Sequence, residues 1–426
     1  MTRQATRRLP LYGWLTAEGI SLLGTRVSMI AIPWLVLVTT GSPTQTGLVA
    51  VAEITPMVAL KAVGGPLVDR VGPRRMAITA DVFSMVAVGL IPLLHRADHL
   101  TFPLLLGLVA VAGALRGPGD AATTALIPAL VERAEVPYER ATGLSGAIER
   151  GSTMLGAALA GGLVATIGPA NAVAVDALSF GLCALVLVVT TRSLEERGLD
   201  GPDRREEPDR RGTTSYGAEL REGWDFLRRD PVLMSLCVMI AVTNLLDLAW
   251  SAVLLPVWAR ESGAGVAAVG LVFSVWGGAS MLGSVVAAAY GTRLPRFTTY
   301  LVAFLITGLP RFVLFALGVP LWAILAMCVV GGCASGFLNP VLGAVQFERI
   351  PRAMVGRVTS LSNALCWSLM PLGGILGGLL VSGLGLTTAL VVVGLAYFVT
   401  TMAPTVLPTF REMDRARVTP PERVLV

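Results

Sequence analysis

Charged side chains recur inside long apolar stretches in the first half of this 426-residue chain. They are Glu18, Arg26, Glu53, Lys61, Asp81, Arg116, Asp120, Glu149, Arg150 and Asp176, whereas the second half offers chiefly Asp247 and Arg311. If these stretches cross a bilayer, a charge at its centre costs about 2.5–3.5 kcal/mol on insertion scales and needs a reason to be there. The uneven distribution indicates that ion coupling belongs to the first half.

The position of each charge along its apolar stretch gives its expected depth in a bilayer, and charges of equal depth on neighbouring stretches are expected to pair. If the first two stretches run in opposite directions, Arg26 and Glu53 both lie near the centre. The same reasoning places Glu18 beside Lys61, nearer one end. A carboxylate kept from water binds a proton more readily, and a nearby guanidinium favours its charged form. Glu53 with Arg26 is therefore the first candidate for proton coupling, and a permanent structural ion pair is the alternative.

A second set of coupling candidates lies on the fourth and fifth apolar stretches. Glu149 is the second choice for the coupling carboxylate, and Arg116 lies at a similar depth. Arg116 and Asp120 are also one helical turn apart, so Asp120 is another candidate partner. The proton-coupling candidates are thus Glu53, Arg26, Glu149, Arg116 and Asp120.

Aromatic and amide side chains within the apolar stretches predict a binding cavity for a large amphipathic molecule. The substrate-cavity candidates are Trp34, Asn244, Asp247, Trp250, Asn339 and Asn363. Packing inside the bundle is the alternative role for each of them. The sequence shows no metal-ligand spacing and no cofactor motif, and its five cysteines lie scattered in apolar stretches.

The elements that carry these residues are predicted to be membrane-spanning helices. Of all residues 54% are apolar and 14% are charged, whereas soluble domains have about 25% charged residues. Mean hydropathy is +0.72, and a spanning helix needs about 20 mainly apolar residues. Twelve stretches qualify, at 11–39, 46–68, 76–95, 101–124, 141–167, 170–191, 231–258, 265–290, 298–318, 320–346, 356–384 and 386–408. The predicted fold class is an all-α membrane protein.

A polar segment at 192–230 divides these spans six and six. The predicted domains are a bundle at 1–191, a cytoplasmic linker at 192–230 that ends in a surface helix, a bundle at 231–408 and a cytoplasmic tail at 409–426. Arginines concentrate in alternate loops, in the linker and at both termini. Because basic residues mark cytoplasmic loops, both termini and the linker are predicted to face the cytoplasm.

The two halves resemble each other in sequence. Residues 140–147 read Arg-Ala-Thr-Gly-Leu-Ser-Gly-Ala, and residues 357–364 read Arg-Val-Thr-Ser-Leu-Ser-Asn-Ala. Transporters built from such parallel repeats place the substrate site between the halves near mid-membrane. Small residues let the repeated helices approach closely, in static packing or in sliding contacts. The glycines in question are Gly156, Gly161, Gly373, Gly377 and Gly378.

The segment between the second and third spans carries a family resemblance. Gly65, Asp69, Arg70, Gly72, Arg74 and Arg75 match the signature Gly-x-x-x-Asp-Arg-x-Gly-x-Arg-Arg. In this loop the chain resembles the major facilitator superfamily, whose fold has twelve helices in two pseudo-symmetric six-helix bundles. The resemblance implies that the loop latches the two halves on the cytoplasmic side. Residues 21–26, 31–34, 116–120 and 138–144 are similar to its macrolide-efflux and siderophore-exporter branch.

Together these features predict a secondary transporter in the cell membrane. The resemblance implies proton-coupled efflux of a small amphipathic molecule such as a drug, a siderophore or a secondary metabolite. The expected partners are that substrate, protons and membrane lipid, with a monomeric chain and no nucleic acid. An importer, a uniporter and a non-transporting scaffold are the alternatives. A membrane enzyme and a primary pump have little support, because HExxH, GxSxG and GxxxxGK[ST] motifs do not occur.

Overall fold

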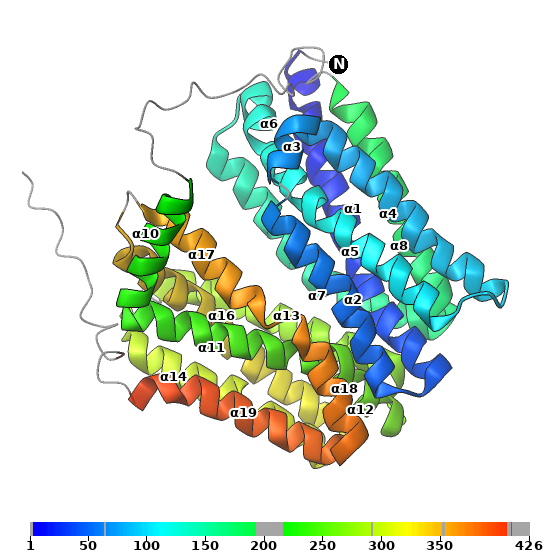
Figure 1. Ribbon diagram of the computed structural model, residues 1–426, viewed down its shortest axis with the longest axis vertical. Helices are drawn as coiled ribbons and strands as arrows, with labels where there is room; N and C mark the ends of the chain where they lie inside the picture. Colours follow the sequence, from blue (N-terminus) through cyan, green and yellow to red (C-terminus); the bar gives the residue numbers. More distant parts are fainter. Residues whose placement is uncertain are drawn as a thin grey trace, which may run out of the picture. The chain divides into compact units, whose positions relative to one another are not determined.

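The computed structural model describes residues 3–63, 65–192, 216–290, 293–351, 354–406 and 410. Within these ranges every regular element is a helix (Figure 1). The first helices are α1 (Arg3–Thr40), α2 (Pro43–Val63), α3 (Gly65–Val71), α4 (Pro73–Arg96), α5 (Phe102–Ala125), α6 (Ile127–Ala134), α7 (Tyr138–Ile167) and α8 (Pro169–Thr190). After them come α10 (Tyr216–Arg229), α11 (Pro231–Ala249), the π-helical turn η1 (Trp250–Leu254), α12 (Leu255–Glu261), α13 (Gly265–Tyr290), α14 (Arg296–Thr307), α15 (Leu309–Ala316), α16 (Leu321–Arg349), α17 (Val355–Ser368), α18 (Leu372–Leu384) and α19 (Leu386–Val406).

Ten of the described helices or joined helix segments are long and apolar enough to cross a membrane. The prediction of an all-helical membrane chain is therefore confirmed, while the number twelve stays a prediction. The remaining two predicted spans, 46–68 and 141–167, form α2 and α7. Both carry charges that lower their apolar character, with Glu53 and Lys61 on α2 and Glu149 and Arg150 on α7.

The two faces of α8 show that lipid is the solvent of this bundle. Leu178, Leu182, Leu185 and Val189 recur at helical spacing and are between 48% and 70% exposed. On the opposite face, Asp176, Cys183 and Leu187 are buried. A helix with large aliphatic residues outside and a carboxylate inside is stable only where its outer face meets hydrocarbon.

The chain forms two compact units. The first comprises Met1–Arg210, Ala249–Ser274 and Gly374–Gly383, and the second comprises Arg211–Leu248, Val275–Gly373 and Leu384–Val426. In the first unit α1 packs against α7 and α8, α5 against α2 and α4, and α4 against α8. These six helices lie side by side in one bundle (Figure 1). The predicted division into bundles 1–191 and 231–408 stays a prediction.

In the second unit, α14 packs against α16 and α19, and α10 packs against α17. The helix α10 occupies the end of the predicted linker. Its Leu227 is buried in a cluster with Leu233, Ile350 and Val358, whereas Trp224 is 40% exposed. Residues 193–215 of the linker and 411–426 of the tail lie outside the described residues, so their predicted cytoplasmic location stays a prediction.

Glycines at matching places bring helices into close contact in both units. An added Cβ at Gly117 of α5 would lie 2.6 Å from the Met57 carbonyl oxygen and 2.8 Å from the backbone nitrogen of Lys61 on α2. In the second unit an added Cβ at Gly336 of α16 would lie 2.5 Å from the Ser280 carbonyl oxygen of α13. Gly113 and Gly332, one turn earlier, make equivalent contacts. The packing of α5 on α2 thus has a counterpart in α16 on α13.

We expect Gly117→Ala to lower the stability of the protein by about 1–3 kcal/mol, because the new methyl group meets backbone atoms that cannot move independently. Gly107→Ala on the same helix is the matched control, since a Cβ there meets no atom within 4 Å. Thermal unfolding in detergent measures the stability of both variants. Equal unfolding temperatures for the two variants would contradict the close contact between α5 and α2.

Candidate functional site

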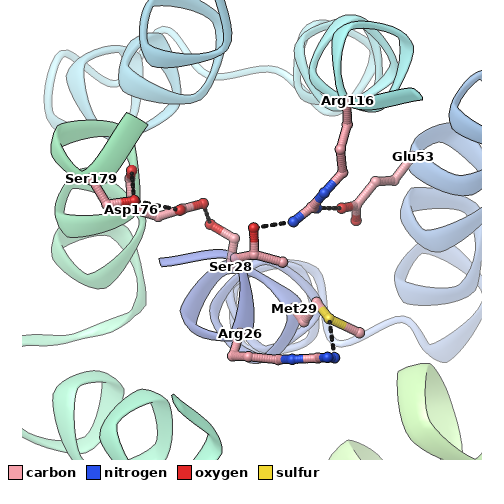
Figure 2. A network of polar contacts seen from close by, with 8 residues as sticks. Arg26, Ser28, Met29, Glu53, Arg116, Asp176 and Ser179 are labelled. Carbon is pink, nitrogen blue, oxygen red and sulfur yellow. Dashed lines mark hydrogen bonds and ion pairs between the residues drawn. The ribbon is translucent and has the colours of Figure 1, made fainter. Parts of the chain in front are cut away.

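The centre of the first unit holds an ion pair between two helices. Arg116 Nη1 of α5 lies 3.4 Å from Glu53 Oε1 of α2, and the two side chains are 20% and 21% exposed. Nη2 of Arg116 donates to the hydroxyl of Thr25 on α1 (Figure 2). Gly113 makes the approach possible, because an added Cβ there would lie 2.9 Å from the Glu53 carbonyl carbon. Three helices therefore meet at one guanidinium.

A second carboxylate, Asp176 of α8, lies on another side of α1. It accepts a hydrogen bond from the Ser28 hydroxyl of α1 and one of 3.3 Å from the Ser179 hydroxyl (Figure 2). Asp176 is 1% exposed. Gly24 allows this contact, since a Cβ there would lie 2.5 Å from Asp176 Oδ1. Hydroxyls of α1 thus contact both Arg116 and Asp176.

Arg26 points away from this centre, which corrects the predicted pairing with Glu53. Its Nη2 donates to the Thr153 hydroxyl of α7 at 3.0 Å, and its Nη1 lies 3.5 Å from Met29 Sδ. The stem of Arg26 covers Gly156, where an added Cβ would lie 2.8 Å from the Arg26 Cβ. The rotation of α1 places Arg26 on the side away from Arg116 and Glu53 (Figure 2), where it contacts Thr153 of α7.

A polar cavity of about 380 Å³ adjoins the central pair within the first unit. Its charged lining is Glu18, Lys61, Asp81, Arg116, Asp120 and Glu149. Trp14, Leu22, Leu115, Ile127 and Phe180 supply apolar lining. The cavity thus combines flat apolar surfaces with a majority of carboxylates, a composition that suits a small amphipathic ligand.

The other ion pairs around this cavity also differ from the predicted ones. Lys61 Nζ lies 3.7 Å from Asp120 Oδ2, whereas Glu18 accepts a 2.8 Å hydrogen bond from Ser145. The predicted pair of Glu18 with Lys61 is therefore wrong, although both line the cavity. Arg116 pairs with Glu53 rather than with Asp120 or Glu149, because the close packing of α5 on α2 brings Glu53 nearer.

The predicted gating loop forms α3 and the start of α4. Gly72, which joins them, has φ 90° and ψ 134°, a backbone conformation that favours glycine. Arg74 is buried, and it donates to the Thr191 hydroxyl at 2.9 Å and to the Val188 carbonyl at 3.2 Å. It thereby binds the carboxyl end of α8, where a cation is favourable.

Arg70 and Arg75, also in this loop, are exposed. Gly65 and Asp69 lie on α3, but the surroundings of both residues are outside what the structure describes. The role of the loop as a latch stays a prediction.

The substrate-cavity candidates do not come together in one described cavity. Asp247 pairs with Arg311 in the second unit, where the Arg311 guanidinium lies 5.5 Å from the Trp276 ring centre. Asn244 donates to the Cys366 carbonyl at 3.0 Å. Trp250 is buried against Phe273, Trp34 is half-buried, and Asn339 and Asn363 are exposed. Their roles stay predictions.

Four of the predicted packing glycines, Gly156, Gly161, Gly377 and Gly378, lie at close helix contacts of the first unit. A Cβ at Gly161 of α7 would lie 2.9 Å from the Gly270 Cα of α13. On α18, a Cβ at Gly377 would lie 3.0 Å from the Ala249 carbonyl oxygen, and one at Gly378 would lie 2.7 Å from the Thr44 Cα. Gly373 precedes them on the same helix. Whether these helices slide stays a prediction.

Sequence reasoning left four residues out of the site. Asp81 and Asp176 were recognised only as charges inside apolar stretches, and Thr25 and Ser28 were not singled out. A signal existed for the hydroxyls, because Thr25 and Ser28 are three residues apart on one helix and project to adjoining directions. Single hydroxyls are common in membrane helices, so the pattern alone carries little information.

Comparison with known proteins identifies the family. The model of the Major Facilitator Superfamily matches residues 15–371 and 240–424. The multidrug efflux pump Tap of Mycobacterium tuberculosis (strain ATCC 25618 / H37Rv) is 30% identical over 414 residues, which cover 96% of this chain and 96% of that protein. Tap of Mycolicibacterium fortuitum is 28% identical over 416 residues, with 96% and 98% covered.

Solved structures show the same fold at low sequence identity. The nucleoside transporter NupG superposes with a TM-score of 0.71 at 12% identity, over 95% of this chain and 98% of its own. A bacterial homologue of the human lysosomal transporter Spinster, inward-facing and unoccupied, has a TM-score of 0.67 at 15% identity, over 98% of each chain. The protein belongs to the major facilitator superfamily. It is a multi-pass membrane transporter and not an enzyme, and the predicted family is confirmed.

A double-mutant cycle tests the central ion pair. Glu53→Gln and Arg116→Gln each leave one buried charge unpaired, so each should cost about 3–5 kcal/mol of stability. The double variant should lose less than the sum, with a coupling energy of about 0.5–3 kcal/mol. Equilibrium unfolding in mixed micelles measures these values.

The pair of Lys61 and Asp120 is the matched control. Their side chains are 51% and 49% exposed, so the same cycle with Lys61→Gln and Asp120→Asn should give a coupling energy below about 1 kcal/mol. Strictly additive losses for Glu53 and Arg116 would show that the two side chains do not stabilise each other.

Proposed function

We propose that this protein is a proton-coupled antiporter that exports a small amphipathic molecule. The observation that carries the proposal is the ion pair of Arg116 and Glu53, which lies beside a polar cavity inside a lipid-facing bundle. Relatives that cover 96% of the chain are named multidrug efflux pumps, which favours export over import and uniport. A non-transporting scaffold would not need such a cavity.

Glu53 is the proposed proton carrier because its charge is balanced by one removable contact. While Glu53 is ionised, Arg116 holds it at 3.4 Å. When a proton binds Glu53, the carboxyl group no longer needs the guanidinium, and Arg116 keeps its hydrogen bond to Thr25. Since Arg116 also lines the large cavity, its positive charge then faces the substrate. Proton binding and substrate binding thereby become alternatives.

The cavity lining favours an amphipathic substrate with a positive or polar part. Four carboxylates line it against one lysine and one arginine, and Trp14 and Phe180 offer flat apolar surface. A drug, a siderophore and a secondary metabolite all fit this description. The similarity to the multidrug efflux pump Tap favours a drug among them.

The proposal includes the predicted topology. We count α2 and α7 as spans beside the ten apolar helical segments, which gives twelve proposed spans. An even number of spans favours both termini on one side, and the basic loops favour the cytoplasm as that side. We propose the cell membrane as the location and a monomer as the active form, with protons and lipid as further partners.

Transport by purified protein in proteoliposomes tests the function. We expect an imposed proton gradient to drive uphill movement of at least one dye from a panel of ethidium, rhodamine 6G and doxorubicin, with protons moving in the opposite direction. Glu53→Gln should abolish gradient-driven movement while dye exchange without a gradient continues, because the substituted side chain cannot release a proton. Dye flux is followed by fluorescence and proton flux by a pH indicator.

Asp98→Asn is the control for that experiment, since Asp98 lies in the turn after α4 with φ 54°, a conformation that Asn adopts readily. It should transport like wild type. Wild-type dye flux that ignores the gradient would overturn antiport in favour of a uniporter. Wild-type coupling in Glu53→Gln would remove Glu53 from the mechanism.

Cysteine labelling tests the topology. In a Cys333→Ser background the remaining native cysteines are buried. We expect Asp98→Cys to react with a membrane-impermeant maleimide in intact cells, because the turn after α4 is predicted to face outward. Arg204→Cys, in the linker, should react only in inside-out vesicles. Labelling of Arg204→Cys in intact cells would refute the predicted orientation.

A further inference from the structure

A second buried carboxylate adjoins the central pair and has no part in the cycle above. Asp176 is 1% exposed, and the hydroxyls of Ser28 and Ser179 donate to it. Within the ranges that the structure describes, no lysine or arginine lies at ion-pair distance from Asp176. The opposite face of its helix presents large aliphatic residues to lipid, so the carboxylate of Asp176 faces the interior of the bundle.

Asp176 and the central pair line the same small cavity. This cavity has a volume of about 20 Å³, and its polar lining is Ser28, Glu53, Arg116 and Asp176. The rest of the lining is apolar. Such a volume holds about one water molecule, which needs two to four polar partners. The two carboxylates therefore line one cavity whose remaining lining is apolar.

Charge balance sets the number of protons in this cavity. Glu53 from α2 and Asp176 from α8 face a single cation, Arg116 from α5. With both carboxylates ionised the cluster carries one net negative charge, and one bound proton makes it neutral. The neutral state of this cavity therefore holds one proton between the two carboxylates.

Four other charges that the structure describes on α1, α4 and α7 lie outside this cavity. Arg26 of α1 is directed at Thr153 of α7, and Glu149 of α7 lines the larger cavity. Asp81 of α4 lies two turns farther along α8, beside Cys183. Glu18 of α1 is held by Ser145.

We propose that Asp176 and Glu53 share one proton around Arg116, so that Asp176 is a second proton-binding residue of the transport cycle. The inference rests on the proposed antiport function. With the proton on Asp176, its hydroxyl group donates to the Ser28 oxygen and Glu53 pairs with Arg116. With the proton on Glu53, Asp176 is ionised and accepts the hydrogen bond of the Ser28 hydroxyl, while Arg116 keeps its hydrogen bond to Thr25. The proton moves between the two through the 20 Å³ cavity.

Arg116 and Phe180 line both this cavity and the larger one. Movement of their side chains opens the path by which the shared proton leaves toward the substrate. One proton therefore enters the pair and one leaves it in each cycle, and neither carboxylate needs a second cation.

Infrared difference spectroscopy of the protein in nanodiscs, taken across a pH titration, tests the shared proton. We expect a carbonyl band from a protonated carboxyl group that shifts in part when aspartate is labelled with carbon-13. Asp176→Asn and Glu53→Gln should each remove the band, because the remaining carboxylate then faces the positive charge of Arg116 in the same cavity without a competing anion. Asp98→Asn should keep it. The carbon-13 shift is measured on wild-type protein. It therefore tests whether an aspartate carries the proton even if Asp176→Asn does not fold.

Transport of the panel dyes separates this proposal from the proposed function. Asp176→Asn should lose gradient-driven dye movement at least tenfold while dye exchange persists, which corresponds to about 1.4 kcal/mol. A wild-type band that carries no aspartate component, or an Asp176→Asn variant that couples like wild type, overturns the shared proton and leaves antiport standing. Wild-type transport indifferent to the gradient overturns antiport, whatever the spectrum shows.

Discussion

The arrangement of the first unit depends on keeping one guanidinium balanced inside a bundle whose outer surface is hydrocarbon. Arg116 cannot lie there without an anion, and Glu53 supplies it at 3.4 Å. The remaining features follow from this need. Gly113 and Gly117 bring α2 close enough for the contact, and the hydroxyl of Thr25 accepts a further donor of the guanidinium. The polar interior is therefore built from small residues on the helices around a single charge.

The second unit shows what the same packing looks like without the charge. Gly332 and Gly336 of α16 contact α13 as Gly113 and Gly117 contact α2. Ser335, three residues after Gly332, stands where Arg116 stands after Gly113, and its hydroxyl bonds to Ser280 at 3.1 Å. A pair of hydroxyls thus replaces an ion pair on an equivalent scaffold. The repeat preserved the helix contact and let the two interiors diverge in chemistry.

The helices, the concentration of charges in the first half and the family signature were all predictable, because hydrophobic length and short motifs are local properties of the chain. Which charged residues pair with one another was not predictable from the sequence. Each residue along a helix turns the side chain by about 100°, and the close contact of Arg26 with Gly156 places it against α7 instead of beside Glu53. Asp176 was visible as a buried acid, yet its contact with Ser28 depends on how closely α8 approaches Gly24. Such approach is a property of several helices at once.

The hydrogen bonds of Arg74 have a mechanical consequence. This side chain joins the start of α4 to the last turn of α8 through Thr191 and Val188. Because these hydrogen bonds fix the end of α8 to the start of α4, and the two helices also pack along their length, α4 and α8 form one rigid arm. Asp176 lies near the other end of that arm, several turns away. Any torque applied where α3 meets α4 therefore reaches the acid as a rotation of its helix, without a chain of intervening side chains.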